Sequence, residues 1–484
     1  MSTMPYTFLC VTVLLILIRG WASNAHSSIG IGSQKRLGKV VRLSGWHRLP
    51  NQTNQLVVQD MSNDNVLAEM TENIQGNQKE LLGVPTTLLP YYVAFMLDSV
   101  AVGLVMPLLP FYLMELGASA LQLSLVVSAN YVAQMAGVLV MGKVSDQYGR
   151  RIVMLACLAA SSLSYFCVSC AKSLPAVALA RVISGALGGL MPVVQSAVAD
   201  ATTLSDRPKY LGRISATFGL GFALGPALST ALPNLSAMQK IRVAVCLPLL
   251  GFFVTLFFAK ETKRNVIPFI SRRKPRETEL HTAKIHTAPL KSVNPITKEV
   301  SLLVLNGFLI MFAFGTETVY ALLLKDAFGY GEAALSTLLA VNGLFIGLVQ
   351  VLLIKPLVHC IGQRGTLMLG NAFMAIGMLG LAAVRYQPLH FVLFSIHIVA
   401  YTVAETALVS LISRYSTLQS QGRDLALNQA AQACARVFSP LIAGLLYEQS
   451  KLSTLSILPV GALPFVVGGL CSLAAVVIPA LLKR

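Results

Sequence analysis

The stretch that decides the fold is Gly142-Lys-Val-Ser-Asp146-Gln-Tyr-Gly149-Arg150-Arg151. It lies between two long apolar runs, at about 121–141 and 152–171. Each run has about the 20 residues that a helix needs to cross the hydrocarbon core of a bilayer. A charged, glycine-containing decapeptide between two such runs predicts a tight turn in water, on the side that retains positive charge. We expect its two glycines to allow the turn, and its aspartate to cap a helix or to pair with an arginine.

The composition places the whole chain in a membrane. Of the 484 residues, 55% are hydrophobic and only 12% are charged, and the mean hydropathy is +0.69. A soluble domain carries about 25% charged residues, so an integral membrane protein is predicted. The twelve apolar runs that indicate spans lie at about 86–112, 121–141, 152–171, 175–198, 210–233, 243–259, 299–323, 333–354, 366–384, 389–412, 425–447 and 457–482.

The same composition excludes several classes of function. The net charge is +17, but the bases lie in loops between spans without interleaved aromatic residues, which argues against nucleic-acid binding. Cys167-x-x-Cys170 has metal spacing but no partner pair, so we expect the cysteines to serve packing and predict no metal. No phosphate-binding G-x-x-x-x-G-K-[ST] motif and no catalytic spacing is present, which predicts no cofactor and no enzyme activity.

A second copy of the decapeptide indicates that the chain consists of two related halves. Lys355 to Arg364 aligns with Gly142 to Arg151 at an offset of 213 residues, so that Gly362 meets Gly149 and His359 meets Asp146. We therefore predict an all-α fold of twelve transmembrane helices in two pseudo-symmetric bundles of six. The expected parts are a first bundle at 85–259, a basic central loop at 260–297, and a second bundle at 298–484.

The first 84 residues have the composition of a targeting region. Residues 1–22 hold a short apolar run like that of a signal peptide, and residues 23–84 form a basic extension without an acid before Asp60. This composition is typical of an organellar transit peptide, although a disordered tail with no targeting function fits as well.

The orientation of the spans bears on the membrane. Alternate loops and the C-terminus place 22 Lys and Arg residues on one side and six on the other, which puts both ends of the spanning region inside. A cleaved secretory signal would conflict with that orientation. We therefore favour an organellar inner membrane of the plastid type, with an endomembrane or the plasma membrane as alternatives.

Five ionisable residues inside apolar spans are the main candidates for a transport site. An unpaired charge at the centre of a span costs roughly 2.5–3.5 kcal/mol on insertion scales, so each must face a cavity, find a partner or be neutral. A carboxyl that alternates between protonated and ionised forms is what proton coupling needs. Glu317 or Glu405 would be the partner of the arginine in span 11. The five residues are Asp98, Arg181, Glu317, Glu405 and Arg436.

Three polar residues and a glycine motif complete the candidate set. Asn130 and Gln134 lie one turn apart and share a helix face, where they could line a cavity or bond two helices. His397 lies eight residues from Glu405, so the two could form a proton relay, or each could be satisfied separately by packing. Gly221, Gly225 and Pro226 give one helix a smooth, bent face for close packing.

The decapeptide resembles the signature loop of the major facilitator superfamily, which reads G-x-x-x-D-x-x-G-R-[RK] between spans 2 and 3. Arg181-x-x-x-Gly185 resembles the superfamily's span-4 motif, whose arginine is implicated in proton coupling. Gly221-x-x-x-Gly225-Pro226 resembles a motif of the antiporter branches, although Ser229-Thr230 replace the two glycines that follow there. The resemblance covers about 85–482.

Within that superfamily, the first half is most similar to tetracycline-type drug:proton antiporters. Asp98, Arg181, Ala199-Asp200 and Gly225-Pro226 stand in the same order and spacing as in those proteins. The resemblance implies that protons move inward in exchange for organic molecules, and that Asp98 and Asp146 matter to transport. Tetracycline exporters carry an acid where this chain has Ser164 and another in span 9, where this chain has none, which argues against a metal–tetracycline chelate as substrate.

We therefore expect a secondary active transporter that moves a small organic solute across a membrane by proton antiport. Its two bundles would alternate around the ionisable residues at the midplane. The alternatives are a uniporter that does not use protons, and a membrane receptor or scaffold that has a transporter fold without turnover. The expected partners are the lipid bilayer, the solute and protons, and the expected state is a monomer.

Overall fold

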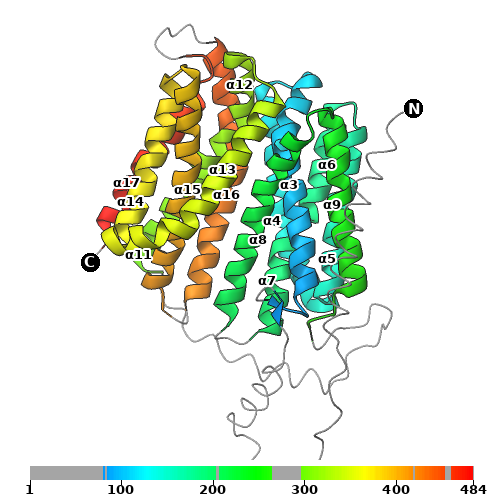
Figure 1. The fold of residues 1–484 in the computed structure, drawn as a ribbon. Helices are drawn as coiled ribbons and strands as arrows, with labels where there is room; N and C mark the ends of the chain where they lie inside the picture. The colour runs from blue at the N-terminus through cyan, green and yellow to red at the C-terminus, as the bar shows by residue number, and fades with distance from the viewer. Residues whose placement is uncertain are drawn as a thin grey trace, which may run out of the picture. The chain divides into compact units, whose positions relative to one another are not determined.

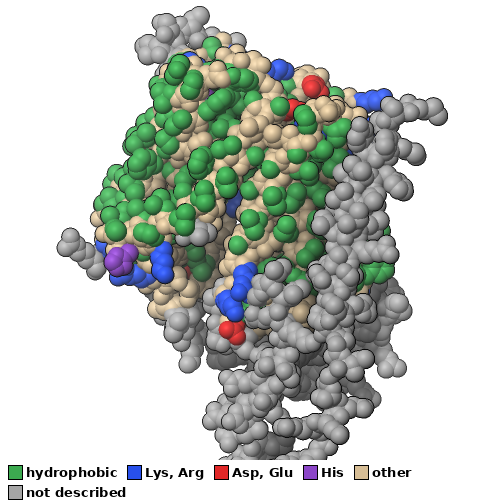
Figure 2. Space-filling view, viewed as in Figure 1, with side chains coloured by type: hydrophobic (Ala, Val, Ile, Leu, Met, Phe, Trp, Pro, Cys, Tyr) green, Lys and Arg blue, Asp and Glu red, His purple; other side chains and the backbone are tan. Residues whose placement is uncertain are grey.

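The computed structural model describes residues 80–81, 84–202, 206–263, 296–417, 420–452 and 459–482. The segment 1–22, nearly all of the extension 23–84 and most of the loop 260–297 lie outside the described residues. Within the described part, twelve helical segments are long and apolar enough to cross a membrane (Figure 1). Exposed leucine, valine and phenylalanine side chains cover much of the visible surface of the helices, as a lipid environment requires (Figure 2).

The first half of the chain forms one bundle, which a short antiparallel pair of strands precedes. Those strands are β1 (Glu80–Leu81) and β2 (Val84–Pro85). The helices of the first bundle are α3 (Leu89–Glu115), α4 (Ala120–Tyr148), α5 (Arg150–Cys170), α6 (Leu174–Ala186), α7 (Leu190–Ala201), α8 (Arg207–Ala231) and α9 (Ala237–Phe258). Together α6 and α7 make one span, which is interrupted between them.

The second half forms the other bundle and also contains one interrupted span. That span consists of α11 (Lys298–Gly315), the 3-10 turn η2 (Thr316–Val319) and α12 (Tyr320–Phe328). The other helices are α13 (Glu332–Leu352), α14 (Ile354–Ala383), α15 (Gln387–Tyr415), α16 (Gln421–Leu452) and α17 (Leu463–Val477), and the turn η3 (Ile478–Leu481) extends α17. The expected spans 175–198 and 299–323 are therefore each interrupted part-way along their length.

The local signals for these helices are visible in the sequence. Ser119 and Ser236 each begin a helix with a capping box, in which the serine hydroxyl accepts from the backbone three residues on and a glutamine side chain bonds back. Glycines set how closely the helices approach. A Cβ on Gly225 would lie 2.4 Å from the backbone of Gly103, so α8 packs directly on α3.

The turn expected over 142–151 is shorter than the sequence analysis predicted, and this expectation was wrong. Helix α4 continues through Tyr148, and α5 begins at Arg150, so Gly149 alone leaves the helical conformation. Gly149 has φ 99° and ψ 159°, a region that favours glycine. Gly142 is helical, and a Cβ there would meet nothing within 4 Å, so it does not make the turn.

The two bundles share a hydrophobic core on one side of the molecule only. We call the side that carries Gly149 the inner side and the opposite side the outer side. On the outer side one buried cluster joins both bundles, with Leu108 and Leu123 from the first and Tyr320 and Phe394 from the second. Towards the inner side the buried clusters are separate for each bundle. The boundary between the two bundles, which we call the seam, is therefore closely packed on the outer side and parted on the inner side. Figure 2 shows the seam hollowed towards its lower end.

Candidate functional site

Asp98 occupies a buried position in the middle of α3. It is 9% exposed, and one of its carboxylate oxygens, Oδ1, lacks a hydrogen-bond partner. Ser161 on α5 is a polar neighbour of the carboxylate, close enough to stabilise its negative charge. Among the described residues, no basic nitrogen lies within 4.0 Å of it. Asp98 is therefore a buried carboxyl that could accept or release a proton without first breaking an ion pair.

Arg181 and Asp98 do not pair, but both act electrostatically on the same tyrosine, Tyr165. Arg181 is half-buried on α6, one residue beyond the middle of that helix and before the interruption of the span. Tyr165 is buried on α5, within electrostatic range of both charges. The first bundle thus gathers a carboxyl, a phenol and a guanidinium that the sequence separates by 83 residues.

The second bundle has its own cluster, centred on the 3-10 turn in the seventh span. That turn carries Glu317, whose Oε2 lies 3.7 Å from Nε2 of the fully buried His397 on α15. His397 also packs against the ring of Phe314 at the end of α11. The sequence analysis paired His397 with Glu405 as one alternative, but the carboxylate within reach is Glu317.

Glu405 and Arg436 face each other across α15 and α16 without forming an ion pair. The side chain of Gln432 donates to Oε2 of Glu405 at 2.8 Å. Arg436 is close enough to act electrostatically on Glu405 and on Tyr401, but among the described residues no carboxylate oxygen lies within 4.0 Å of its guanidinium. The expected ion pair of Arg436 with Glu317 or Glu405 is therefore not formed in this conformation.

Asn130 and Gln134 lie on α4 where it meets α6. A Cβ on Gly185 would lie 2.5 Å from the carbonyl oxygen of Asn130, and a Cβ on Gly188 would lie 3.4 Å from Cγ of Gln134. Both polar side chains are half-buried at this close contact. Their neighbour Tyr131 reaches the electrostatic range of Tyr401 in the other bundle. Helix α4 therefore adjoins the polar clusters of both bundles.

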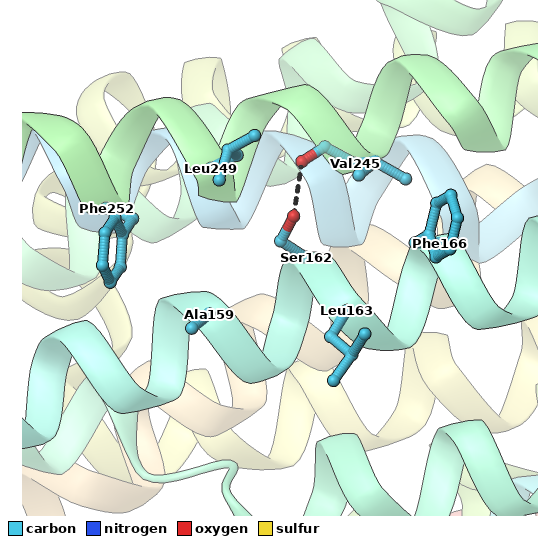
Figure 3. Close-up of a pocket in the computed structure, with 7 residues that line it drawn as sticks. All are labelled: Ala159, Ser162, Leu163, Phe166, Val245, Leu249 and Phe252. Carbon is cyan, nitrogen blue, oxygen red and sulfur yellow. Dashed lines mark hydrogen bonds between the residues drawn. The ribbon is translucent and has the colours of Figure 1, made fainter.

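An apolar groove on the surface of the first bundle is separate from these charged clusters. It lies between α5 and α9, and Figure 3 shows the side chains that line it. Phe166 and Leu249 are exposed there, and the one polar side chain, Ser162, is already bonded to the carbonyl of Val245 at 3.0 Å. This groove has the character of a lipid-facing surface rather than of a solute site.

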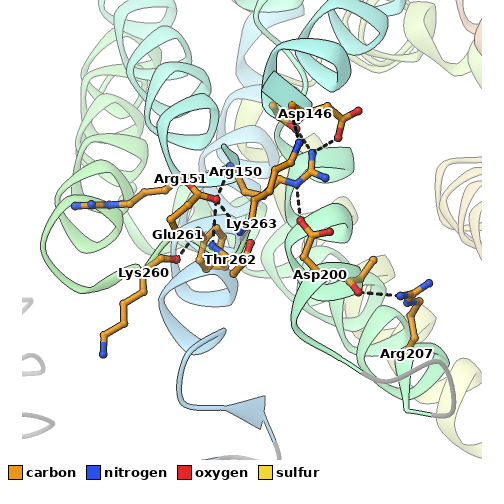
Figure 4. A network of polar contacts seen from close by, with 12 residues as sticks. Asp146, Arg150, Arg151, Asp200, Arg207, Lys260, Glu261, Thr262 and Lys263 are labelled. Atoms are coloured by element: carbon orange, nitrogen blue, oxygen red, sulfur yellow. Dashed lines mark hydrogen bonds and ion pairs between the residues drawn. The ribbon is translucent and has the colours of Figure 1, made fainter. Parts of the chain in front are cut away.

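At the inner side, Gly149 allows a carboxylate to approach the start of α5 (Figure 4). Oε1 and Oε2 of Glu261 accept the backbone N–H groups of Arg150 and Arg151 at 2.8 and 3.0 Å. A Cβ on Gly149 would lie 2.4 Å from Oε2 of this carboxylate. Glu261 thereby satisfies free N–H groups and the positive end of the helix dipole. It also ties the end of α9 to the start of α5.

Arg150 links three helix ends in the same network. Its guanidinium lies 2.7 Å from Oδ1 of Asp146 at the end of α4 and 2.8 Å from Oδ2 of Asp200 near the end of α7. Arg150 is 7% exposed, so the two carboxylates neutralise a nearly buried charge. The neighbouring Arg151 donates to the carbonyl of Leu256 in α9. These contacts therefore join the inner ends of α4, α5, α7 and α9 (Figure 4).

Comparison with known proteins identifies the family. The family model of the Major Facilitator Superfamily matches residues 91–352 and 302–484. The chain belongs to the major facilitator superfamily. Membership confirms the predicted fold of twelve helices in a multi-pass integral membrane protein, and it places the chain among transporters rather than enzymes.

Two curated relatives of this facilitator are drug-resistance proteins by name. The class B tetracycline resistance protein of Escherichia coli is 26% identical over 362 residues, covering 74% of this chain and 88% of that protein. Multidrug resistance protein 2 of Bacillus subtilis is 23% identical over 369 residues, covering 74% and 86%. The crystal structure of the human organic anion transporter MFSD10 (TETRAN) has a TM-score of 0.57 at 21% identity and covers 81% of this chain and 99% of that chain.

Sequence reasoning missed Glu261 as part of the inner network of this facilitator. The residue was visible only as one acid in the run Lys260-Glu261-Thr262-Lys263 at the end of a span. A single carboxylate among bases, on the same side as the signature loop, was the available signal. Ser161 and Tyr165, in the span at 152–171, were not among the predicted site residues either. Their contact with the charged residues depends on how α5 packs against α3 and α6.

On the outer side, polar contacts join the two bundles of the facilitator. Nζ of Lys240 on α9 lies 3.0 Å from Oε1 of Glu332 at the start of α13, and Lys240 is 3% exposed. Oε1 of Glu448 on α16 accepts the backbone N–H of Leu121 on α4 at 3.0 Å. These contacts reinforce the shared core there. The described residues contain no cluster of three His, Cys, Asp or Glu side chains that could hold a metal ion.

Proposed function

We propose that this facilitator is a secondary active transporter that exports a small organic solute in exchange for protons. The observation that carries the proposal is Asp98, a buried carboxyl that has a serine neighbour but no basic partner within 4.0 Å in the described part of the chain. Such a group can change its protonation state with the conformation of the bundles around it. The relatives named for drug resistance support an outward direction of the solute.

The arrangement of the bundles supports alternating access. The seam is packed on the outer side and parted on the inner side, so the described conformation faces inward. We propose that the inner network of Asp146, Arg150, Asp200 and Glu261 keeps the first bundle rigid while it moves against the second. The outer contact of Lys240 with Glu332 would have to break when the protein opens outward.

The test is proton movement in vesicles that contain the purified protein and a pH-reporting dye. A panel of organic cations, anions and neutral drugs is added one at a time against an imposed proton gradient. In wild type we expect one class of compound to dissipate the gradient. In Asp98→Asn, whose side chain cannot titrate, we expect the exchange to fall to the level of protein-free vesicles.

The matched control is Glu115→Gln, which removes a carboxyl from the exposed outer end of the same helix. It should leave exchange unchanged. If labelled solute equilibrates equally in wild type and Asp98→Asn and no protons move, the protein is a uniporter. If neither solute nor protons move across the panel, the protein does not transport, and the proposal is wrong.

A further inference from the structure

Two half-buried arginines, one in each bundle, have no carboxylate partner among the described residues. Arg150 and Lys240 each lie within 3.0 Å of a carboxylate. Arg385 donates to three backbone carbonyls. By contrast, no carboxylate of the described residues lies within 4.0 Å of Arg181 or Arg436. Because arginine does not lose its proton, both positions keep a positive charge without a protein counter-ion.

The nearby carboxylates are engaged by other groups. Glu405 accepts from Gln432, Glu317 lies against His397, and Ser161 is the polar neighbour of Asp98. Arg181 lies within electrostatic range of the neutral hydroxyl of Tyr165. Neither guanidinium is therefore paired with an acid of the described residues, although Arg436 lies within electrostatic range of Glu405.

The two arginines come from different bundles and adjoin the same helix. Arg181 is one turn before Gly185, which packs on the backbone of α4 at Asn130. Arg436 is two turns before Gly444, which packs on α4 at Ser124. Both guanidinia are half-buried, so they are neither in bulk water nor sealed in the core. A ligand that contacts both arginines would bridge the bundles across their seam.

Aromatic rings lie beside the second arginine. Tyr401 is within the electrostatic range of Arg436, and its ring stacks on Phe314 with 4.1 Å between centroids. Tyr131 of the first bundle approaches Tyr401 from across the seam. Tyr401 and Phe314 are both half-buried. A planar ring next to a guanidinium is a surface that suits a flat, negatively charged molecule.

We propose that Arg181 and Arg436 bind the acidic group of a small aromatic organic anion, whose ring lies against Tyr401 and Phe314. The proposal rests on the function proposed above, because it names the class of solute that the midplane site accepts. The oxygens of a carboxylate or sulfonate can accept hydrogen bonds from two N–H groups of one guanidinium. The negative charge of such a group also supplies the counter-ion that both arginines lack among the described residues. One arginine from each bundle lets the anion hold the bundles together when it is bound.

The proposal can be tested by binding, without any proton gradient. The full chain is purified in detergent, and equilibrium dialysis measures labelled benzoate and benzenesulfonate. Benzyltrimethylammonium has the ring but the opposite charge, and cyclohexanecarboxylate has the charge but no aromatic ring. We expect saturable binding of both aromatic anions, weaker binding of cyclohexanecarboxylate, and no competition by the cation.

Variants at the two arginines then locate the site. Loss of a charge-assisted hydrogen bond should weaken benzoate binding roughly tenfold or more in Arg181→Gln and in Arg436→Gln. The lysine variants at the same positions should recover part of the affinity, which a purely structural role would not predict. Arg385→Gln is the control, because that arginine lies between spans and bonds only to backbone carbonyls in the described structure, and it should bind as wild type does.

Each other outcome decides between the two proposals. Benzoate affinity that is unchanged in both glutamine variants, equal competition by the cation, or no saturable binding of either aromatic anion to folded wild type would overturn the anion site. Antiport would still stand if a cation moved protons in an Asp98-dependent way. Conversely, arginine-dependent benzoate binding with no proton movement in vesicles would refute antiport and leave the anion site in place.

Discussion

The two halves of the chain repeat one backbone feature and differ in the charges around it. Gly149 in the first half has φ 99° and ψ 159°, and Gly362 in the second half has φ 72° and ψ 170°. Two residues after each glycine, an arginine donates to a backbone carbonyl near the end of the last span of its own half. Those pairs are Arg151 with Leu256 and Arg364 with Leu482. The kink and the arginine anchor have thus been kept in both halves.

The residue between the glycine and that arginine shows the difference. In the first half it is Arg150, which lies between the carboxylates of Asp146 and Asp200. In the second half it is Gln363, whose amide donates to the hydroxyl of Ser410 at 2.7 Å. One kink is therefore held by ion pairs and a carboxylate cap, and the other by neutral hydrogen bonds. The second loop keeps the kink without the ion pairs, so the shape of the loop does not require them. We infer that the charges of the first loop serve the movement of the bundles instead.

The largest contrast is expected when a methyl group is added at each glycine. Gly149→Ala should cost about 3 kcal/mol, because a Cβ is strained at positive φ and would displace the Glu261 carboxylate. Gly362→Ala should cost only about 1 kcal/mol, since a Cβ there meets nothing within 4 Å. Thermal unfolding in detergent measures both. Equal losses would show that Glu261 contributes nothing to the first kink.

Removal of the charge at position 150 should have the next largest effect. Arg150→Gln copies the second half and leaves Asp200 without its partner, at a cost of about 2 kcal/mol. This is less than for a fully buried pair because Asp200 is 29% exposed. The matched variant Gln363→Ala should cost about 0.5–1 kcal/mol, as for one neutral hydrogen bond. Solute exchange should fall in the first variant and persist in the second. Full exchange by Arg150→Gln would contradict a role for the charge in movement.

The smallest effects are expected at the two carboxylates that hold Arg150. Asp200→Asn should lower the stability by about 1 kcal/mol, whereas Asp146→Asn should lower it by less than about 0.5 kcal/mol, because Asp146 is 63% exposed and its ion pair is screened by water. Added salt should reduce the difference between Asp146→Asn and wild type in the Tm measurement. A larger loss for Asp146→Asn than for Asp200→Asn would reverse this order and indicate that Asp146 acts elsewhere.

A fair part of the fold and of the candidate site followed from sequence patterns. The apolar runs predicted the spans, and the repeat of Gly149 at Gly362 predicted two related halves. The patterns failed where a contact depends on helices far apart in the chain. Helical periodicity placed His397 and Glu405 on one face, but it could not show that η2 brings Glu317 to the histidine instead. In the same way, Glu261 gained its role only when α9 was packed beside α5.

The sequence by itself determined that this chain crosses a membrane with two bundles of helices and that ionisable residues are placed inside the spans. Hydrophobic length and spacing are local properties, so the residues near each span suffice to predict them. Only the tertiary structure decided which charges meet and which do not. Among the described residues, it left Arg181 and Arg436 without an acid within 4.0 Å, gave Arg150 two, and closed the seam on the outer side. These outcomes depend on distances of a few ångströms between helices, and electrostatic energies at such distances are set by packing rather than by order in the chain.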